Sequence, residues 1–115
     1  MTDRDLVEGI SREVVAENLQ IYRRLFQETS LAETKDAYWK SALSLYAELS
    51  DNQRGQLFKI IHQTIIDTIS NMFGLIDGVS SLTGQTEALS LLHGEVHLEG
   101  DLQDLFLERI ELEQQ

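Results

Sequence analysis

Three histidines are the side chains of this sequence to consider first for metal chemistry, because the chain has no cysteine. His93 and His97 enclose a glycine, a glutamate and a valine, but the glutamate lies one position away from its place in the zinc-protease pattern His-Glu-x-x-His. His62 belongs to a strongly apolar segment, where an imidazole is usually packed and hydrogen-bonded. We therefore predict no metal site and no cofactor.

A loop with two glycines raises a second class of chemistry, the binding of phosphate groups. The segment 78–86 contains Gly78 and Gly84, but their spacing is not that of a phosphate-binding loop, and Gln85 stands where such a loop has its lysine. The Gly-x-Ser-x-Gly pattern of serine hydrolases does not occur in the sequence. We therefore predict that the protein is not an enzyme.

Carboxylates near the C-terminus form the clearest functional pattern. Four of them recur at steps of three and four residues, which places them on one face of a helix, and two more precede them. The predicted partner-binding residues are Glu95, Glu99, Asp101, Asp104, Glu108 and Glu111. Such a surface either only keeps a protein soluble or docks a basic protein partner.

The distribution of charge supports this interest in the C-terminal half. The net charge is −11, and residues 60–115 hold ten acidic side chains but only one basic one, Arg109. Nucleic acids and anionic membranes bind basic surfaces, so neither is an expected partner.

Length and composition are those of one globular domain. The chain has 115 residues, 42% of them hydrophobic and 25% charged, which suffices for one hydrophobic core. We predict a single domain spanning 1–115. The first five residues lack the basic and apolar regions of a signal peptide, so a cytoplasmic protein is expected.

Apolar residues at helical spacing predict three long helices, spanning about 3–29, 31–49 and 51–77. Their starts follow capping signals at Thr2, Ser30 and Ser50. The third helix has the broadest apolar arc and is predicted to be the central core helix. Lys59 and Asp67 interrupt its apolar run, so it is not a membrane span.

The first helix carries apolar residues around much of its circumference. The main stripe, predicted to face inward, contains Leu6, Ile10, Val14, Ile21 and Leu25. Leu19 and Phe26 lie on the side away from Leu6. A small domain has few elements to cover such a surface, so a symmetric homodimer through this helix is a hypothesis.

The segment 88–99 fits two structures. A β-hairpin turning at His93-Gly94 would pair Leu91 with Val96 and give the alternation of a half-buried ladder. A helix also fits the leucines but would place a glycine in its middle, so we predict the hairpin. A short helix over about 101–112, capped by Asp101, completes the chain.

The predicted fold is therefore mostly α, with three long helices, a β-hairpin and a short C-terminal helix. In composition the chain resembles small acidic helical immunity and antitoxin proteins of bacteria, and that resemblance implies a protein partner. We predict a non-enzymatic interaction domain whose acidic C-terminal surface docks a basic protein. The alternative is a small-molecule-binding domain or an enzyme with a cleft near His62, Asp77 and the 79–87 loop.

Overall fold

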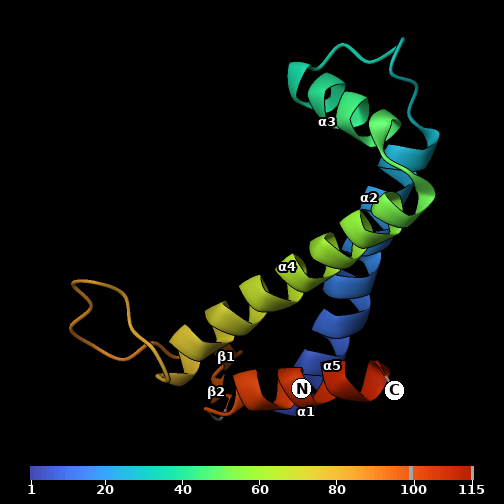
Figure 1. Ribbon diagram of the computed structural model, residues 1–115. Helices are drawn as coiled ribbons and strands as arrows, with labels where there is room; N and C mark the ends of the chain where they lie inside the picture. Colours follow the sequence, from blue (N-terminus) through green and yellow to red (C-terminus); the bar gives the residue numbers. More distant parts are fainter. Residues whose placement is uncertain (99, 115) are drawn as a thin grey trace.

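Helices make up most of the molecule, which confirms the predicted fold class (Figure 1). The computed structural model describes residues 1–98 and 100–114. In chain order the elements are α1 (Asp3–Ile10), η1 (Ser11–Ala16), α2 (Glu17–Glu28), α3 (Ala37–Glu48), α4 (Asp51–Asp77), β1 (Leu92–His93), β2 (Val96–His97) and α5 (Leu102–Glu113).

The elements α1, η1 and α2 together form the predicted first helix, which contains one π-helical segment. A π turn holds more residues than the 3.6 of an α-helix, so residues four apart stay on one face through it. Val7, Ser11 and Val15 are accordingly buried along this helix. The predicted inward stripe was partly wrong, because Ile21 is exposed and Leu25 only half-buried.

The second helix, α3, begins six residues later than predicted. The Ser30 capping signal closes a turn instead, in which the Thr34 hydroxyl and the Glu33 backbone N–H both donate to the Ser30 carbonyl. The cap of α3 is Asp36, whose side chain accepts a hydrogen bond from the Trp39 backbone N–H at 3.2 Å.

The central helix, α4, has the predicted bounds of 51–77. At its start the Ser50 hydroxyl accepts a hydrogen bond from the Gln53 backbone, and the Gln53 side chain accepts one from the Ser50 backbone. At its end Gly78 adopts a left-handed conformation with φ of 81°, which glycine reaches at no steric cost.

The hairpin forms, but its turn lies one residue later than predicted, so that Val96 pairs with His93 and not with Leu91. Leu92 pairs with His97 and His93 with Val96, so the turn is Gly94-Glu95. Gly94 has φ of 62°, and the first central position of a type II′ turn is the one that requires glycine. This requirement explains why the turn begins at Gly94. The two strands are solvent-exposed, whereas half-buried strands were predicted.

Two apolar clusters lie at the two ends of α4. The first is formed by buried side chains of α1, η1, α4 and α5, namely Val7, Val15, Ile66, Phe73, Leu102, Phe106 and Ile110. The second is aromatic and is centred on Phe26 of α2. The centroid of its ring lies 5.7 Å from the ring centroid of Trp39, 5.1 Å from that of Tyr46 and 6.1 Å from that of Phe58. The molecule is elongated, with extents of 50 × 36 × 24 Å.

Candidate protein-interaction surface

The acidic residues predicted on the last helix share its solvent-exposed side. Asp104, Glu108 and Glu111 lie on α5, and Asp101 immediately precedes it; all four are exposed. The opposite side of α5 is buried, and Phe106 is 0% exposed. We refer to the exposed side as the α5 outer face and define it by Asp101, Asp104, Leu107, Glu108, Glu111 and Leu112.

The start of α5 is fixed by a residue of another helix. The carboxylate of Asp77 accepts hydrogen bonds from the backbone N–H groups of Leu102 at 3.1 Å and Gln103 at 2.7 Å. Asp101, the predicted cap, makes no capping bond through its side chain with the described residues. Asp101 therefore occupies the predicted N-cap position, but the capping bonds come from Asp77, because the free N–H groups of α5 face the end of α4.

A second contact ties α5 to α4 about two helical turns before the end of α4. The Gln103 side-chain amide donates to the Ser70 carbonyl at 2.9 Å and lies 3.3 Å from the Ser70 hydroxyl. Gly74 leaves room for it, since a Cβ atom at this position would lie 2.8 Å from Gln103 Nε2. The backbone that carries the α5 outer face is therefore held from both the side and the end.

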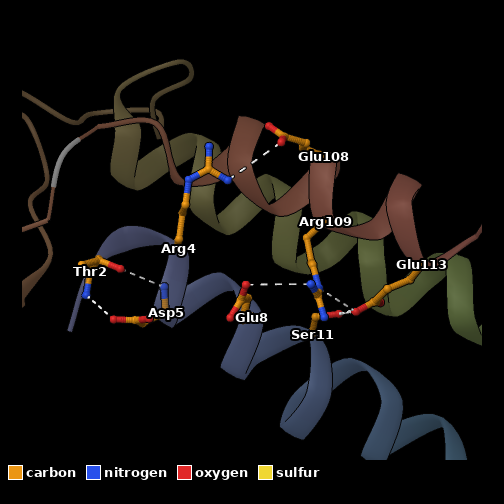
Figure 2. Close-up of polar contacts among 8 residues, drawn as sticks. All are labelled: Thr2, Arg4, Asp5, Glu8, Ser11, Glu108, Arg109 and Glu113. Carbon is orange, nitrogen blue, oxygen red and sulfur yellow. Dashed lines mark hydrogen bonds and ion pairs between the residues drawn. The ribbon is translucent and has the colours of Figure 1, made fainter.

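Polar contacts between α1 and α5 alter the charge along this face (Figure 2). Arg4 Nη1 lies 3.9 Å from Glu108 Oε1, so part of the Glu108 charge is compensated. Arg109 lies between Glu8, at 3.8 Å, and Glu113, at 2.9 Å. These side chains are 41–69% exposed, so each pair contributes little to stability.

The buried hydroxyl of Ser11 adds another polar contact between the first helix and α5. Its Oγ lies 2.8 and 2.7 Å from the two carboxylate oxygens of Glu113 and donates its proton to one of them at a time (Figure 2). Ser11 is 1% exposed, and a buried hydroxyl requires such a partner. Sequence reasoning missed this contact, because it joins residues 102 positions apart.

Three carboxylates of the α5 outer face keep an uncompensated charge. Asp101, Asp104 and Glu111 form no ion pair with the residues that the structure describes. Leu107 and Leu112 are 38% and 56% exposed beside them. These two leucines therefore lie at the edge of the acidic surface.

The two remaining acidic residues of the predicted set lie upstream of α5. Glu95 is exposed at the tip of the hairpin, in the turn between β1 and β2. Figure 1 shows the hairpin near the start of α5. Glu99 lies outside the residues that the structure describes.

The alternative site near His62 and Asp77 is not brought together. Both residues belong to α4 and are 15 positions apart, which is about 22 Å along an α-helix. The 79–87 loop follows the end of α4, next to Asp77, and Asp77 is engaged in capping α5. These groups therefore do not form one cleft.

The other two histidines lie on opposite faces of the hairpin. His93 is paired with Val96, whereas His97 is paired with Leu92 on the other face of the ladder. The His97 Nδ1 atom lies 2.8 Å from the Ser90 hydroxyl. Within residues 1–98 and 100–114, no group of three or more side chains is arranged to hold a metal ion.

Comparison of the chain with protein-family models, curated proteins and solved structures gave no match. No helix in the described part of the chain has both the length and the apolar character needed to cross a membrane. The functional argument therefore depends on the geometry and charge of the chain itself.

Proposed function

We propose that the protein is a non-enzymatic interaction domain that docks a basic protein partner on the α5 outer face. The observation that carries the proposal is the set of three uncompensated carboxylates, Asp101, Asp104 and Glu111, on a helix whose position is fixed. Because α5 is held by Asp77 and by a buried phenylalanine, these charges would enter a complex already positioned. Preorganised charges lose less side-chain and backbone entropy on binding than mobile ones.

The field around this surface favours a basic partner. Residues 60–115 carry ten of the twenty acidic side chains and only one of the nine basic ones. Charge of one sign attracts an oppositely charged partner over roughly a Debye length, about 8–10 Å at physiological salt, and raises the association rate. Nucleic acid and anionic membrane surfaces carry the same sign as this surface and are excluded from the proposal.

The exposed leucines indicate the rest of the partner's chemistry. Leu107 and Leu112 border the carboxylates, so a matching surface has lysine or arginine residues next to apolar ones. Interfaces commonly combine an apolar centre with a charged rim. An immunity-like or antitoxin-like role, in which an acidic protein covers a basic partner, fits this chemistry.

The test uses a partner recovered from the native host on the tagged full-length protein. Its association rate is measured by stopped flow or surface plasmon resonance at two salt concentrations. The double variant Asp104→Lys and Glu111→Lys should lower the association rate by roughly tenfold or more at low salt and reduce its salt dependence.

A matched control makes the same change in net charge elsewhere. Glu33 and Glu48 are exposed acidic residues in the region of α3, away from α5. Their replacement by lysine should alter the association rate much less. An association rate that responds equally to both double variants, or to neither, would contradict docking through the α5 outer face.

The homodimer expected from the sequence involves a different part of the molecule. Phe26, one of the residues on which that expectation depended, packs against Trp39, Tyr46 and Phe58 within the chain. A contact between two copies through the first helix would therefore depend on other apolar residues than Phe26.

A further inference from the structure

Large apolar side chains of α2 and α4 form a surface that the rest of the described chain covers only in part: Ile21 and Ile60 are exposed, whereas its other residues are half-buried. We define this α2–α4 apolar face by Ile21, Tyr22, Leu25, Ile60, Ile61 and Ile65. Tyr22 and the three isoleucines of α4 line a common hollow of about 210 Å³ together with Thr64. Ile21 and Leu25 line a neighbouring hollow on α2. Ile60 is 54% exposed.

The arrangement of the helices explains why the rest of the chain covers this face only in part. α4 contacts α5, α2 and η1, and its hydrogen bonds to α5 are made by Ser70 and Asp77, toward its C-terminal end. In Figure 1, α3 lies beyond the start of α4, and α5 and the hairpin lie at its other end. Among the described residues, the middle of α4 thus has a neighbouring helix on one side only. Its apolar arc is wide enough to pack against two elements.

The exposed area of the whole chain points to a missing contact of considerable size. A compact monomer of 13.1 kDa is expected to expose about 6,400 Å². This chain exposes 8156 Å². The radius of gyration of 17.7 Å likewise exceeds the about 13 Å expected for a compact chain of this length. The excess area is about 1,800 Å², and obligate homodimers bury about 1,000–2,500 Å² per subunit.

The distribution of charge indicates that a second copy of the chain binds to this face. Two copies with a net charge of −11 each repel one another unless they meet at a surface poor in charge. The α4 segment 60–66 contains no acidic or basic residue other than His62. In a two-fold contact a surface meets itself, so an apolar surface bordered by charges of opposite sign, here Arg24 and Glu28 of α2, is compatible with its own copy, whereas an acidic one is not.

We propose that the α2–α4 apolar face binds the same face of a second copy and forms a symmetric homodimer. The contact covers Ile60 and Ile21 of both subunits. It leaves the α5 outer face of each subunit exposed, because α5 contacts α1 and the other end of α4. A dimer therefore presents two acidic faces, and a partner with two basic sites would bind with avidity.

The test is sedimentation equilibrium of the full chain over a range from about 1 to 200 μM, a span in which moderately stable homodimers dissociate or form. The wild-type protein should sediment as a dimer, twice the chain mass of 13.1 kDa, at the upper end of the range. Ile60→Glu and Ile21→Glu should each raise the dissociation constant by about 100-fold or more, because the dimer would bury an unpaired carboxylate. Both positions are exposed in the monomer, so circular dichroism should show unchanged helix content.

Val79→Glu supplies the matched control, since Val79 is 72% exposed outside this face. It should leave the dissociation constant unchanged within about twofold. A wild-type chain that is monomeric at 200 μM, about the upper limit for a moderately stable dimer, would overturn the proposal. A dimer that both glutamate variants leave intact would overturn it as well. Either result leaves the test of the α5 outer face unaffected, because that test measures binding to a different protein.

Discussion

The carboxylate of Asp77 receives the backbone N–H of Gln103 at 2.7 Å, so the last residue of α4 caps the first turn of α5. An intervening loop and the hairpin separate these residues in the chain. The contact therefore fixes where α5 packs against α4 once the chain has passed through the loop and the hairpin. It also places a negative charge at the positive end of the α5 dipole, which stabilises the helix.

Replacing Asp77 tests this cap. Asp77→Ala should lower the free energy of unfolding by about 1–2 kcal/mol, the cost of losing an N-terminal cap with two charge-assisted hydrogen bonds. Asp101→Ala is the matched control and should cost less than about 0.5 kcal/mol, since Asp101 makes no side-chain capping bond with the described residues. Urea denaturation measures both values. Equal losses in the two variants would contradict the capping role of Asp77.

The contact between Gly74 and Gln103 gives a prediction whose sign depends on the background. In an α-helix, glycine-to-alanine replacement gains about 1 kcal/mol from helix propensity. In the wild-type chain a Cβ atom at position 74 would lie 2.8 Å from the Gln103 amide. Gly74→Ala should therefore displace that amide from Ser70 and lose about 1–2 kcal/mol of hydrogen bonding, which cancels or exceeds the gain.

A double-mutant cycle separates the two effects. In the Gln103→Ala background the amide is already absent, so Gly74→Ala should stabilise the protein by about 1 kcal/mol. Urea denaturation of the four proteins gives the coupling between the residues. A Gly74→Ala effect of the same sign and size in both backgrounds would show that the side chains do not interact.

The extent to which the sequence predicted these features depends on how local each one is. The bounds of α4 were correct because both signals, the Ser50–Gln53 capping box and Gly78, lie within a few residues of the helix ends. Ser30 and Glu33 have an equally good capping-box pattern in the sequence, but the Ser30 carbonyl instead accepts hydrogen bonds from the Glu33 backbone N–H and the Thr34 hydroxyl, which close a turn that no helix continues. Local sequence cannot distinguish these outcomes, because the continuation depends on packing.

Features that join distant segments were missed for a related reason. The capping of α5 by Asp77 links residues 25 positions apart, and a residue next to the helix, Asp101, is the stronger candidate from sequence alone. The face of α5 that carries the acidic residues follows from their spacing and is exposed in the structure. The compensation of Glu108 by Arg4 does not follow from spacing, because α1 and α5 are at opposite ends of the chain.

The N-terminal capping box predicts a pH effect at Asp5. The Thr2 backbone N–H donates to the Asp5 carboxylate, and the Thr2 hydroxyl accepts a hydrogen bond from the Asp5 backbone N–H. The backbone bond is the main cause that lowers the pKa of Asp5 below its ordinary value of 3.8, and the Thr2 side chain lowers it further. A depressed carboxyl pKa adds stability above the unfolded value, and this stability is lost as the pH falls through the folded value. Nuclear magnetic resonance titration should show the low pKa. In Thr2→Val, which removes the hydroxyl, the pKa should rise toward 3.8; an unchanged value would exclude a contribution of the hydroxyl.

The ion pair between Arg4 and Glu108 gives the sharpest test of the α5 outer face. Arg4 compensates part of the Glu108 charge at 3.9 Å. Arg4→Gln should therefore expose that charge and increase the association rate with a basic partner by about two- to threefold at low salt. Arg12→Gln makes the same change in net charge at an exposed position that pairs with Glu13 and with no carboxylate of α5 among the described residues. It should have a smaller effect, and high salt should remove the difference between the two variants. If the carboxylates only keep the protein soluble, Arg4→Gln and Arg12→Gln should give the same association rate at every salt concentration.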